Sequence, residues 1–454
     1  MTDNTDRVPI PNASGDAVAA ESYSSIPTSG EATRLLGDAE SGNATLVSDK
    51  TWPVPDDAPP ATGTVFSSAM NLAACALGAS MLSLPYAMMI SGPIIALQFI
   101  VIFAIMAFVS AQAVVNAGLR VGKSSYDGII RHYFGPVDGT IAEILLAIAL
   151  IVAAISYIVG LADLLPKMLP IPACFGRDVL IMLTLVLLFP VTLVGSLAAF
   201  GPASAIAAGG CYLQAAALVF QLFTNGEWES PKDSTWESVN LGGLIYSMPM
   251  ICFVYAFHYV LTETLCELQN STRMRMALVN ATTIGIQIGC YLPVAIAGYL
   301  IYSGKGITTN VLEKLPEGSL AGFVATWSIG GLLLITYSLF IIPLRQKLEK
   351  KIFGSLTESI KDPKRLLLAG VLNVFVAIAA LSLPDLGLAN TLAGGCIALI
   401  MFYFPGRLMV RFQNELPFEY RDPLRLVIGG IFVFFGVLIC LVGLFGNMIF
   451  DFSS

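Results

Sequence analysis

Charged side chains are scarce in this sequence. Asp, Glu, Lys and Arg make up 12% of its 454 residues, whereas hydrophobic residues make up 56%. A typical soluble domain has about 25% charged residues, so most of this chain cannot face water. The composition therefore indicates an integral membrane protein surrounded by a lipid bilayer, and we expect no nucleic-acid partner.

Catalytic motifs are lacking as well. His132 and His258 are the two histidines, and the sequence has neither a His-Glu-x-x-His zinc motif nor the paired aspartates of an intramembrane protease. Residues 118–124 resemble a phosphate-binding loop, but the tract is one residue short and follows a predicted membrane helix rather than a strand. We therefore expect no enzyme activity, no cofactor and no metal.

Long stretches without charge are what the chain has instead. A helix needs about 20 apolar residues to cross the hydrocarbon core. The 62 residues between Asp57 and Arg120 suffice for two crossings, and the 48 residues 179–226 suffice for another two. Seven further runs suffice for one crossing each: 144–162, 238–262, 276–304, 318–344, 366–384, 386–406 and 426–450. The sequence therefore predicts an all-α integral membrane protein with about eleven transmembrane helices.

The basic residues indicate the orientation. With a cytosolic N-terminus, 16 of the 21 Lys and Arg residues that follow residue 60 fall in loops on the cytosolic side. Cytosolic loops of membrane proteins carry such an excess of positive charge. We therefore predict a cytosolic N-terminus and, for eleven crossings, a C-terminus on the opposite side.

Residues 1–60 differ from the rest in composition. They are rich in Ser, Thr, Asp, Ala and Pro, which is typical of disorder, so we predict a disordered cytosolic tail followed by one membrane domain at residues 61–454. Within the tail, the tracts from Tyr23 to Ile26 and from Glu31 to Leu36 are similar to tyrosine-based and acidic-dileucine sorting signals, which adaptor complexes read. A chance match of such short patterns is the alternative.

Glycine and proline interrupt two of the predicted spans. The first span contains Gly78 and Pro85, and the sixth opens with Gly242 and Gly243 and contains Pro249. These spans are five apart, and paired broken helices mark the substrate site of transporters built from inverted repeats. The sequence therefore predicts a 5+5 inverted repeat with broken helices 1 and 6 and one extra C-terminal helix. Close helix packing without a ligand is the alternative explanation.

The same segments resemble the amino acid/auxin permease family. Residues 78–87 (Gly-Ala-Ser-Met-Leu-Ser-Leu-Pro-Tyr-Ala) are similar to the first-helix motif of that family, Gly-x-Gly-Ile-Leu-Gly-Leu-Pro-Tyr-Ala. Further similarity lies at Phe257 and His258, at residues 266–269 and at residues 341–346, and it extends from about residue 63 to 449. The resemblance implies a LeuT-like fold and a secondary active transporter that moves amino acids across a membrane by alternating access.

The chemistry of an amino acid identifies candidate site residues. Its carboxylate and ammonium groups lose water on entering the membrane, and a broken helix offers free N–H groups to the first and free carbonyls to the second. We predict that the substrate binds to four residues of each broken span: Gly78, Ala79, Ser80 and Met81 in the first, and Ile251, Cys252, Phe253 and Val254 in the sixth.

The coupling ion is open between H⁺ and Na⁺. Thr336 matches the family's sodium-binding threonine, but Ala74 stands where sodium-coupled members have asparagine, and Asn71 lies one turn earlier. His258 and Glu263 in span 6 could carry a proton, since histidine titrates near neutral pH. We favour proton coupling or transport driven by the substrate gradient alone over sodium symport. An amino-acid-sensing receptor on the same fold is a further alternative.

The tail tracts give a prediction about location. If they are sorting signals, replacing Leu35 and Leu36 with Ala moves the protein from endolysosomal or vacuolar membranes to the plasma membrane, because adaptors read the paired leucines. Fluorescence microscopy of the tagged full-length chain measures this, with Leu46 and Val47 replaced by Ala as the matched control. An unchanged distribution in the Leu35 and Leu36 variant would make the tracts accidental.

Overall fold

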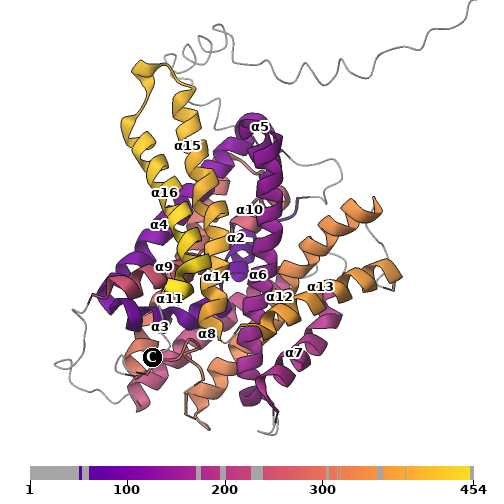
Figure 1. Ribbon diagram of the computed structural model, residues 1–454, viewed down its shortest axis with the longest axis vertical. Helices are drawn as coiled ribbons and strands as arrows, with labels where there is room; N and C mark the ends of the chain where they lie inside the picture. The colour runs from indigo at the N-terminus through magenta and orange to yellow at the C-terminus, as the bar shows by residue number, and fades with distance from the viewer. Residues whose placement is uncertain are drawn as a thin grey trace, which may run out of the picture. The chain divides into compact units, whose positions relative to one another are not determined.

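The protein is a bundle of helices in the computed structural model (Figure 1). The structure describes residues 51–53, 61–169, 175–194, 201–225, 239–302, 306–313, 315–316, 318–354, 361–383 and 385–449. Both predicted sorting tracts lie outside these residues. Within them, the only β-type pairings are two isolated bridges, Thr51 with Thr272 and Gly63 with Leu268.

The helices follow one another along the chain in the order α2 Val65–Ala76, η2 Ala79–Ser83, α3 Leu84–Ser91, α4 Pro93–Val121, α5 Tyr126–Phe134, α6 Pro136–Met168, α7 Arg177–Thr192, α8 Gly201–Asn225, α9 Leu241–Phe253, α10 His258–Glu267, α11 Arg273–Ile301, α12 Leu320–Phe353, α13 Pro363–Leu381, α14 Leu386–Ala398, η5 Leu399–Tyr403, α15 Phe404–Asn414, η6 Phe418–Tyr420 and α16 Pro423–Ile449.

Every predicted span contains one or more helices among the described residues. Nine helical segments among the described residues are long and apolar enough to cross a bilayer, and the bent unit formed by α2, η2 and α3 makes a tenth. Helix α7, with 16 residues, lies at the place of the predicted fourth span. The prediction of an all-α membrane protein is therefore confirmed, and α7 completes the predicted order of eleven segments.

The outer surface of the bundle is apolar. Large side chains of α4, α7, α8, α13 and α16 are 56–70% exposed, among them Ile105, Val186, Phe223, Val371 and Phe434. A surface of this kind would aggregate in water, whereas in a bilayer its helices satisfy their own backbone groups and the side chains contact lipid. The exposure pattern agrees with the composition of the sequence.

Span 1 is broken where the sequence predicts it. Helix α2 ends at Ala76, η2 begins at Ala79, and the two halves of the span are bent by 51°. Pro85 stands in the first turn of α3, where a missing N–H costs nothing because that group has no partner within the helix. Leu77 and Gly78, between the two helices, are extended.

Span 6 is interrupted over four buried residues. Helix α9 ends at Phe253 and α10 begins at His258, and the intervening residues 254–257 are at most 1% exposed. β-Branched and aromatic side chains, which form helices poorly, occupy three of these positions as Val254, Tyr255 and Phe257. The predicted pair of broken spans is therefore present at positions one and six.

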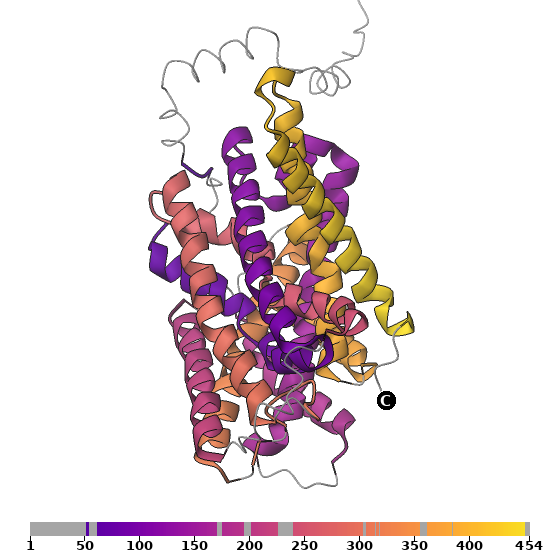
Figure 2. The same ribbon diagram turned by 90° about the vertical axis from the view of Figure 1, so that its left-hand side faces the viewer.

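Glycines set how closely the inner helices approach. A Cβ on Gly243 would lie 1.8 Å from the Ile90 carbonyl oxygen, and one on Gly394 would lie 1.8 Å from the Pro249 carbonyl oxygen. Small residues let membrane helices pack backbone to backbone. Helix α9 consequently contacts α3 on one side and α14 on another, while α11 packs against both α4 and α8 (Figure 2).

A short segment before α2 is also packed, although it belongs to the predicted tail. Trp52 is 2% exposed, its backbone N–H donates to the Ser271 carbonyl at 2.9 Å, and its ring contacts Gly118 at the end of α4. The physical reason is hydrophobic: burying the large indole ring is favourable, even though the residues around it in the sequence are mostly polar. Residues 51–53 are thus an exception to the disorder predicted for residues 1–60.

The crossing of α9 and α14 allows a stability test. Gly394→Ala places a Cβ against the Pro249 carbonyl and forces the two helices apart, so we expect the protein to lose about 1–3 kcal/mol of stability, as overpacked sites do. Gly285→Ala in α11 is the matched control, because nothing lies within 4 Å of that added Cβ and Ala favours helix. Thermal melting in detergent measures both, and equal melting temperatures would contradict the assigned crossing.

Candidate functional site

The break in span 1 leaves backbone groups that no helix pairs. The N–H groups of Gly78, Ala79 and Ser80 have no hydrogen-bond partner among the described residues, whereas the Met81 N–H donates to the Gly78 carbonyl at 3.2 Å. All four residues that we predicted for the substrate site in span 1 are buried. The start of η2 and α3 therefore presents unpaired donors at the positive end of a helix.

The carbonyls on the other side of this break have partners. The Tyr259 hydroxyl donates to the Cys75 carbonyl at 2.9 Å, and the Ser80 hydroxyl donates to the Ala76 carbonyl at 3.3 Å. The Tyr157 hydroxyl donates to the Leu77 carbonyl, also at 3.3 Å. Three protein hydroxyls thus cover the negative end of α2.

One helix joins the two broken spans. On α11, Cys290 Sγ lies 3.9 Å from Met81 Sδ in span 1, and the hydroxyl of the next residue, Tyr291, donates to the Val254 carbonyl in span 6. The Tyr255 ring stands edge-on to Tyr291 at 5.4 Å between centroids, and its buried hydroxyl has no partner. The structure therefore brings Met81 and Val254 to the same turn of α11.

The other predicted residues of span 6 line the end of α9. Ile251, Cys252 and Phe253 are at most 3% exposed. Cys252 Sγ lies 3.9 Å from Met401 Sδ on η5, so this side chain contacts a neighbouring segment rather than span 1. The backbone leaves the helix after Phe253. A turn follows, in which the Ala256 N–H donates to the Phe253 carbonyl at 3.0 Å.

Asn390 on α14 is a site residue that sequence reasoning missed. Its amide nitrogen donates to Ser83 Oγ at 2.8 Å and to the Ala79 carbonyl at 3.4 Å, while its amide oxygen is buried without a partner. Ser83 in turn donates to the Thr309 carbonyl at 2.7 Å. A polar amide within an apolar span was the signal, because such residues are rare and usually functional in membranes.

The predicted sodium residues lie in different surroundings. The Thr336 hydroxyl is buried beside Tyr157 and donates within its own helix, to the Leu332 carbonyl at 2.8 Å. Asn71 lines a small cavity of about 50 Å³ between α2, α10 and α12, which it shares with Glu263 and Lys347. Thr336 is not among the residues that line that cavity.

The predicted proton residues are also apart. His258 is fully buried, its Nε2 atom lies 2.8 Å from Ser110 Oγ on α4, and its ring stacks on Phe257. Glu263 is 43% exposed and lies 3.8 Å from the Lys347 amine on α12. Five residues correspond to about 140° of helical rotation, so the two side chains leave α10 on different faces and a direct proton transfer between them has no geometric support.

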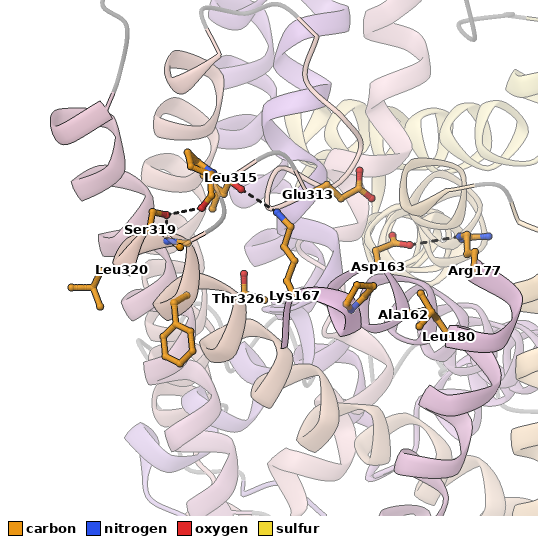
Figure 3. A pocket seen from close by; sticks show the side chains of 15 residues that line it. Ala162, Asp163, Lys167, Arg177, Leu180, Glu313, Leu315, Ser319, Leu320 and Thr326 are labelled. Atoms are coloured by element: carbon orange, nitrogen blue, oxygen red, sulfur yellow. Dashed lines mark hydrogen bonds and ion pairs between the residues drawn. The ribbon is translucent and has the colours of Figure 1, made fainter. Parts of the chain in front are cut away.

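A cavity of about 950 Å³ opens at the end of the bundle where α6 ends and α12 begins (Figure 3). Asp163 faces Arg177 with an N–O distance of 3.6 Å, and Lys167 donates to the Leu312 and Leu315 carbonyls at 2.6 and 3.2 Å. By the predicted orientation this is the outer end, and neither contact was predicted because the partners lie in separate segments of the chain.

A second cavity of about 410 Å³ adjoins the first. It shares Asp163, Arg177 and Glu313 with its neighbour and adds Tyr86 of α3, Thr309 and Asp385. Burial, more than any nearby charge, raises the pKa of the Glu313 carboxyl above its usual value. Because Thr309 also accepts from Ser83, the second cavity leads towards the broken part of span 1.

The sequence matches a known family over most of its length. The family model described as "Transmembrane amino acid transporter protein" matches residues 61–449. "Vacuolar amino acid transporter 5" of Schizosaccharomyces pombe is 26% identical over 367 residues, which cover 77% of this chain and 85% of the relative. "Sodium-coupled neutral amino acid transporter 7" of Xenopus laevis is 24% identical over 368 residues, which cover 76% of this chain and 80% of the relative.

A solved structure shows the same fold. MhsT, in complex with L-phenylalanine, is similar with a TM-score of 0.56, and the match covers 85% of this chain and 99% of that chain. Its sequence identity of 11% makes this a likeness of fold alone. The predicted LeuT-like fold is thereby confirmed.

The break in span 1 generates a prediction. In Gly78→Ala the added Cβ would lie 2.0 Å from the Tyr157 hydroxyl oxygen, so the tyrosine or the backbone must move and the free N–H groups lose their arrangement. We expect amino acid uptake into proteoliposomes to fall at least about tenfold, the loss that 1.4 kcal/mol produces, while gel filtration shows a folded protein. Gly209→Ala, with open space around its Cβ, is the control, and equal uptake by the two variants would contradict the assignment.

Proposed function

Because this chain belongs to the transmembrane amino acid transporter family, we propose that it carries amino acids across a membrane by alternating access, either coupled to protons or driven by the substrate gradient alone. The family consists of transporters rather than enzymes. The observation that carries the proposal is the pair of broken spans. In the first of them, the unpaired N–H groups lie at the start of η2.

The substrate backbone fits these groups by charge. A carboxylate is stabilised at the N-terminal end of a helix by free N–H groups and the helix dipole, which Gly78, Ala79 and Ser80 offer. The ammonium needs acceptors, and the Asn390 amide oxygen, which has no partner, lies on the residue whose amide nitrogen contacts Ala79. Ile251, Cys252, Phe253 and Val254 then form the opposite wall with Met81.

The substrate side chain is proposed to be uncharged. Among the described residues, Arg345, Glu349 and Arg365 are the buried side chains that carry a formal charge, and Arg345 contacts the Val194 carbonyl at 2.9 Å, beyond the end of α7. A charged substrate at depth would need a buried counter-charge. The rings of Tyr157 and Phe340, 4.8 Å apart, suit a neutral side chain better.

Among the described residues, a difference in cavity size between the two ends of the bundle supports alternation. The outer end holds cavities of about 950 and 410 Å³, whereas the cavity between the inner halves of spans 1 and 6 measures about 50 Å³. A carrier that exposes its site to one side at a time has this asymmetry in each of its two states.

The vacuolar relative supports an endolysosomal or vacuolar membrane for this chain. The plasma membrane is the alternative, and in both cases we propose that the N-terminus lies in the cytosol.

Coupling to sodium is the alternative function, and the sodium-coupled relative favours it. Against it, Ala74 offers no side-chain oxygen, and Asn71 lines an inner cavity that excludes Thr336. His258 and Glu263 remain the proposed proton groups, each acting through its own neighbours. An amino-acid-sensing receptor would bind the same ligands without carrying them.

Uptake by the purified full-length chain in proteoliposomes tests the proposal. We expect neutral amino acids to accumulate, with equal rates when choline replaces sodium, and with faster uptake at lower pH on the substrate side if protons are coupled. In that case His258→Ala or Glu263→Gln removes the pH response, whereas Lys351→Gln, which loses only an exposed ion pair with Glu143, keeps it. Binding without uptake of any amino acid would replace the transporter with the sensor.

A further inference from the structure

The carbonyl end of α2 is where a cation would be expected to bind. The last carbonyls of a helix carry partial negative charge and lack partners within the helix, and unwound carbonyls of broken helices hold the coupling ions of related transporter folds. In this chain three of these carbonyls already accept hydrogen bonds from side-chain hydroxyls: Cys75 from Tyr259, Ala76 from Ser80 and Leu77 from Tyr157. Three carbonyls at the end of α2 therefore have hydroxyl partners supplied by the protein itself.

Tyr157 is the most informative of the three donors because it also reaches α12. Its hydroxyl donates to the Leu77 carbonyl and lies beside the Thr336 hydroxyl, the residue that matches the family's sodium-binding threonine. The Tyr157 hydroxyl oxygen lies against Gly78, 2.0 Å from the position that a Cβ on that residue would take. A phenol oxygen thus occupies the gap between the span 1 carbonyls and span 8.

The surrounding helices hold that oxygen in place. The Tyr157 ring meets Phe340 of α12 edge to face at 4.8 Å, and Tyr157 itself is 2% exposed. One turn further along α6, Gly160 lets the helix approach so closely that an added Cβ would lie 3.2 Å from the Ala79 Cβ. The hydroxyl has no room to swing away while α6 stays against the break.

We propose that the Tyr157 hydroxyl replaces a coupling sodium ion between the broken end of span 1 and Thr336, so that this carrier binds its substrate without sodium. A cation and a fixed hydroxyl donor compete for the same carbonyl oxygen. Sodium also needs several oxygens at once, and Ala74 removes one of them. The inference rests on the proposed transport function and deepens it by naming the residue that makes sodium dispensable.

Tyr157→Phe tests this inference against a matched variant. Tyr126→Phe also deletes a buried tyrosine hydroxyl that donates to a backbone carbonyl, that of Ile400 at 2.6 Å, but this bond joins α5 to η5 and involves no residue of the break. In choline medium we expect Tyr157→Phe to lose at least about tenfold in kcat/KM for a neutral amino acid, because the Leu77 carbonyl is left buried without a partner. Tyr126→Phe should transport like the unaltered chain.

Sodium gives the discriminating readout. Since removal of the hydroxyl frees both the carbonyl and the space, added sodium should recover part of the lost transport in Tyr157→Phe and change nothing in the unaltered chain or in Tyr126→Phe. Equal kinetics of Tyr157→Phe and Tyr126→Phe, or uptake by the unaltered chain that requires sodium, would overturn the inference. A purely structural loss would lower transport without any response to sodium and would overturn it too.

The melting temperatures of the purified proteins test the inference even if a variant folds poorly. The melting temperature of the unaltered chain should be the same in sodium and in choline chloride, and a rise specific to sodium would show a sodium site and refute the assignment of Tyr157. Failure of the proposed function looks different, because then the unaltered chain takes up no amino acid under any ionic condition.

Discussion

A backbone group inside a bilayer has no water to bind, so each N–H or C=O freed by a broken helix needs a partner from the protein or from a ligand. The two broken spans divide these groups unequally. The carbonyls of Cys75, Ala76, Leu77 and Val254 all accept from hydroxyls, while the first N–H groups of η2 stay open among the described residues. The protein thus supplies hydroxyl partners to carbonyls at the negative helix ends and leaves N–H groups at the positive end of a half-helix open, where we propose that a carboxylate binds.

This arrangement depends on close approach of helices that are distant in sequence. Tyr157 reaches the Leu77 carbonyl across 80 positions, and Asn390 reaches the Ala79 carbonyl across 311. Glycine makes both contacts possible, because any side chain on Gly78 would displace the tyrosine and one on Gly394 would separate α14 from α9. Small residues at these crossings therefore help to shape the candidate site by letting the helices approach closely.

Sequence reasoning predicted the parts of the structure that are local. Charge-free runs predicted the spans, and the small residues and prolines around Gly78 and Pro249 predicted which spans are broken, because hydropathy and helix breaking are properties of neighbours along the chain. Side-chain partners were not predictable. His258 bonds to Ser110, 148 positions away, and Glu263 faces Lys347 rather than His258, since spacing along one helix does not say which other helix packs against it.

The inner end of the bundle constrains how the proposed alternation can occur. Backbone bonds tie the start of α2 to the segment after α10, from the Gly63 N–H to the Glu267 carbonyl at 2.8 Å and from the Gln269 N–H to the Gly63 carbonyl at 2.9 Å. These two half-helices must therefore move together, bending at the breaks where no helical bonds resist. Across the small inner cavity, the half-exposed ion pair of Glu263 with Lys347 joins these half-helices to α12. Pairs of this kind contribute about 1 kcal/mol or less, so this pair adds little resistance to opening, and the packing of α2 against α8 and α11 is the larger constraint.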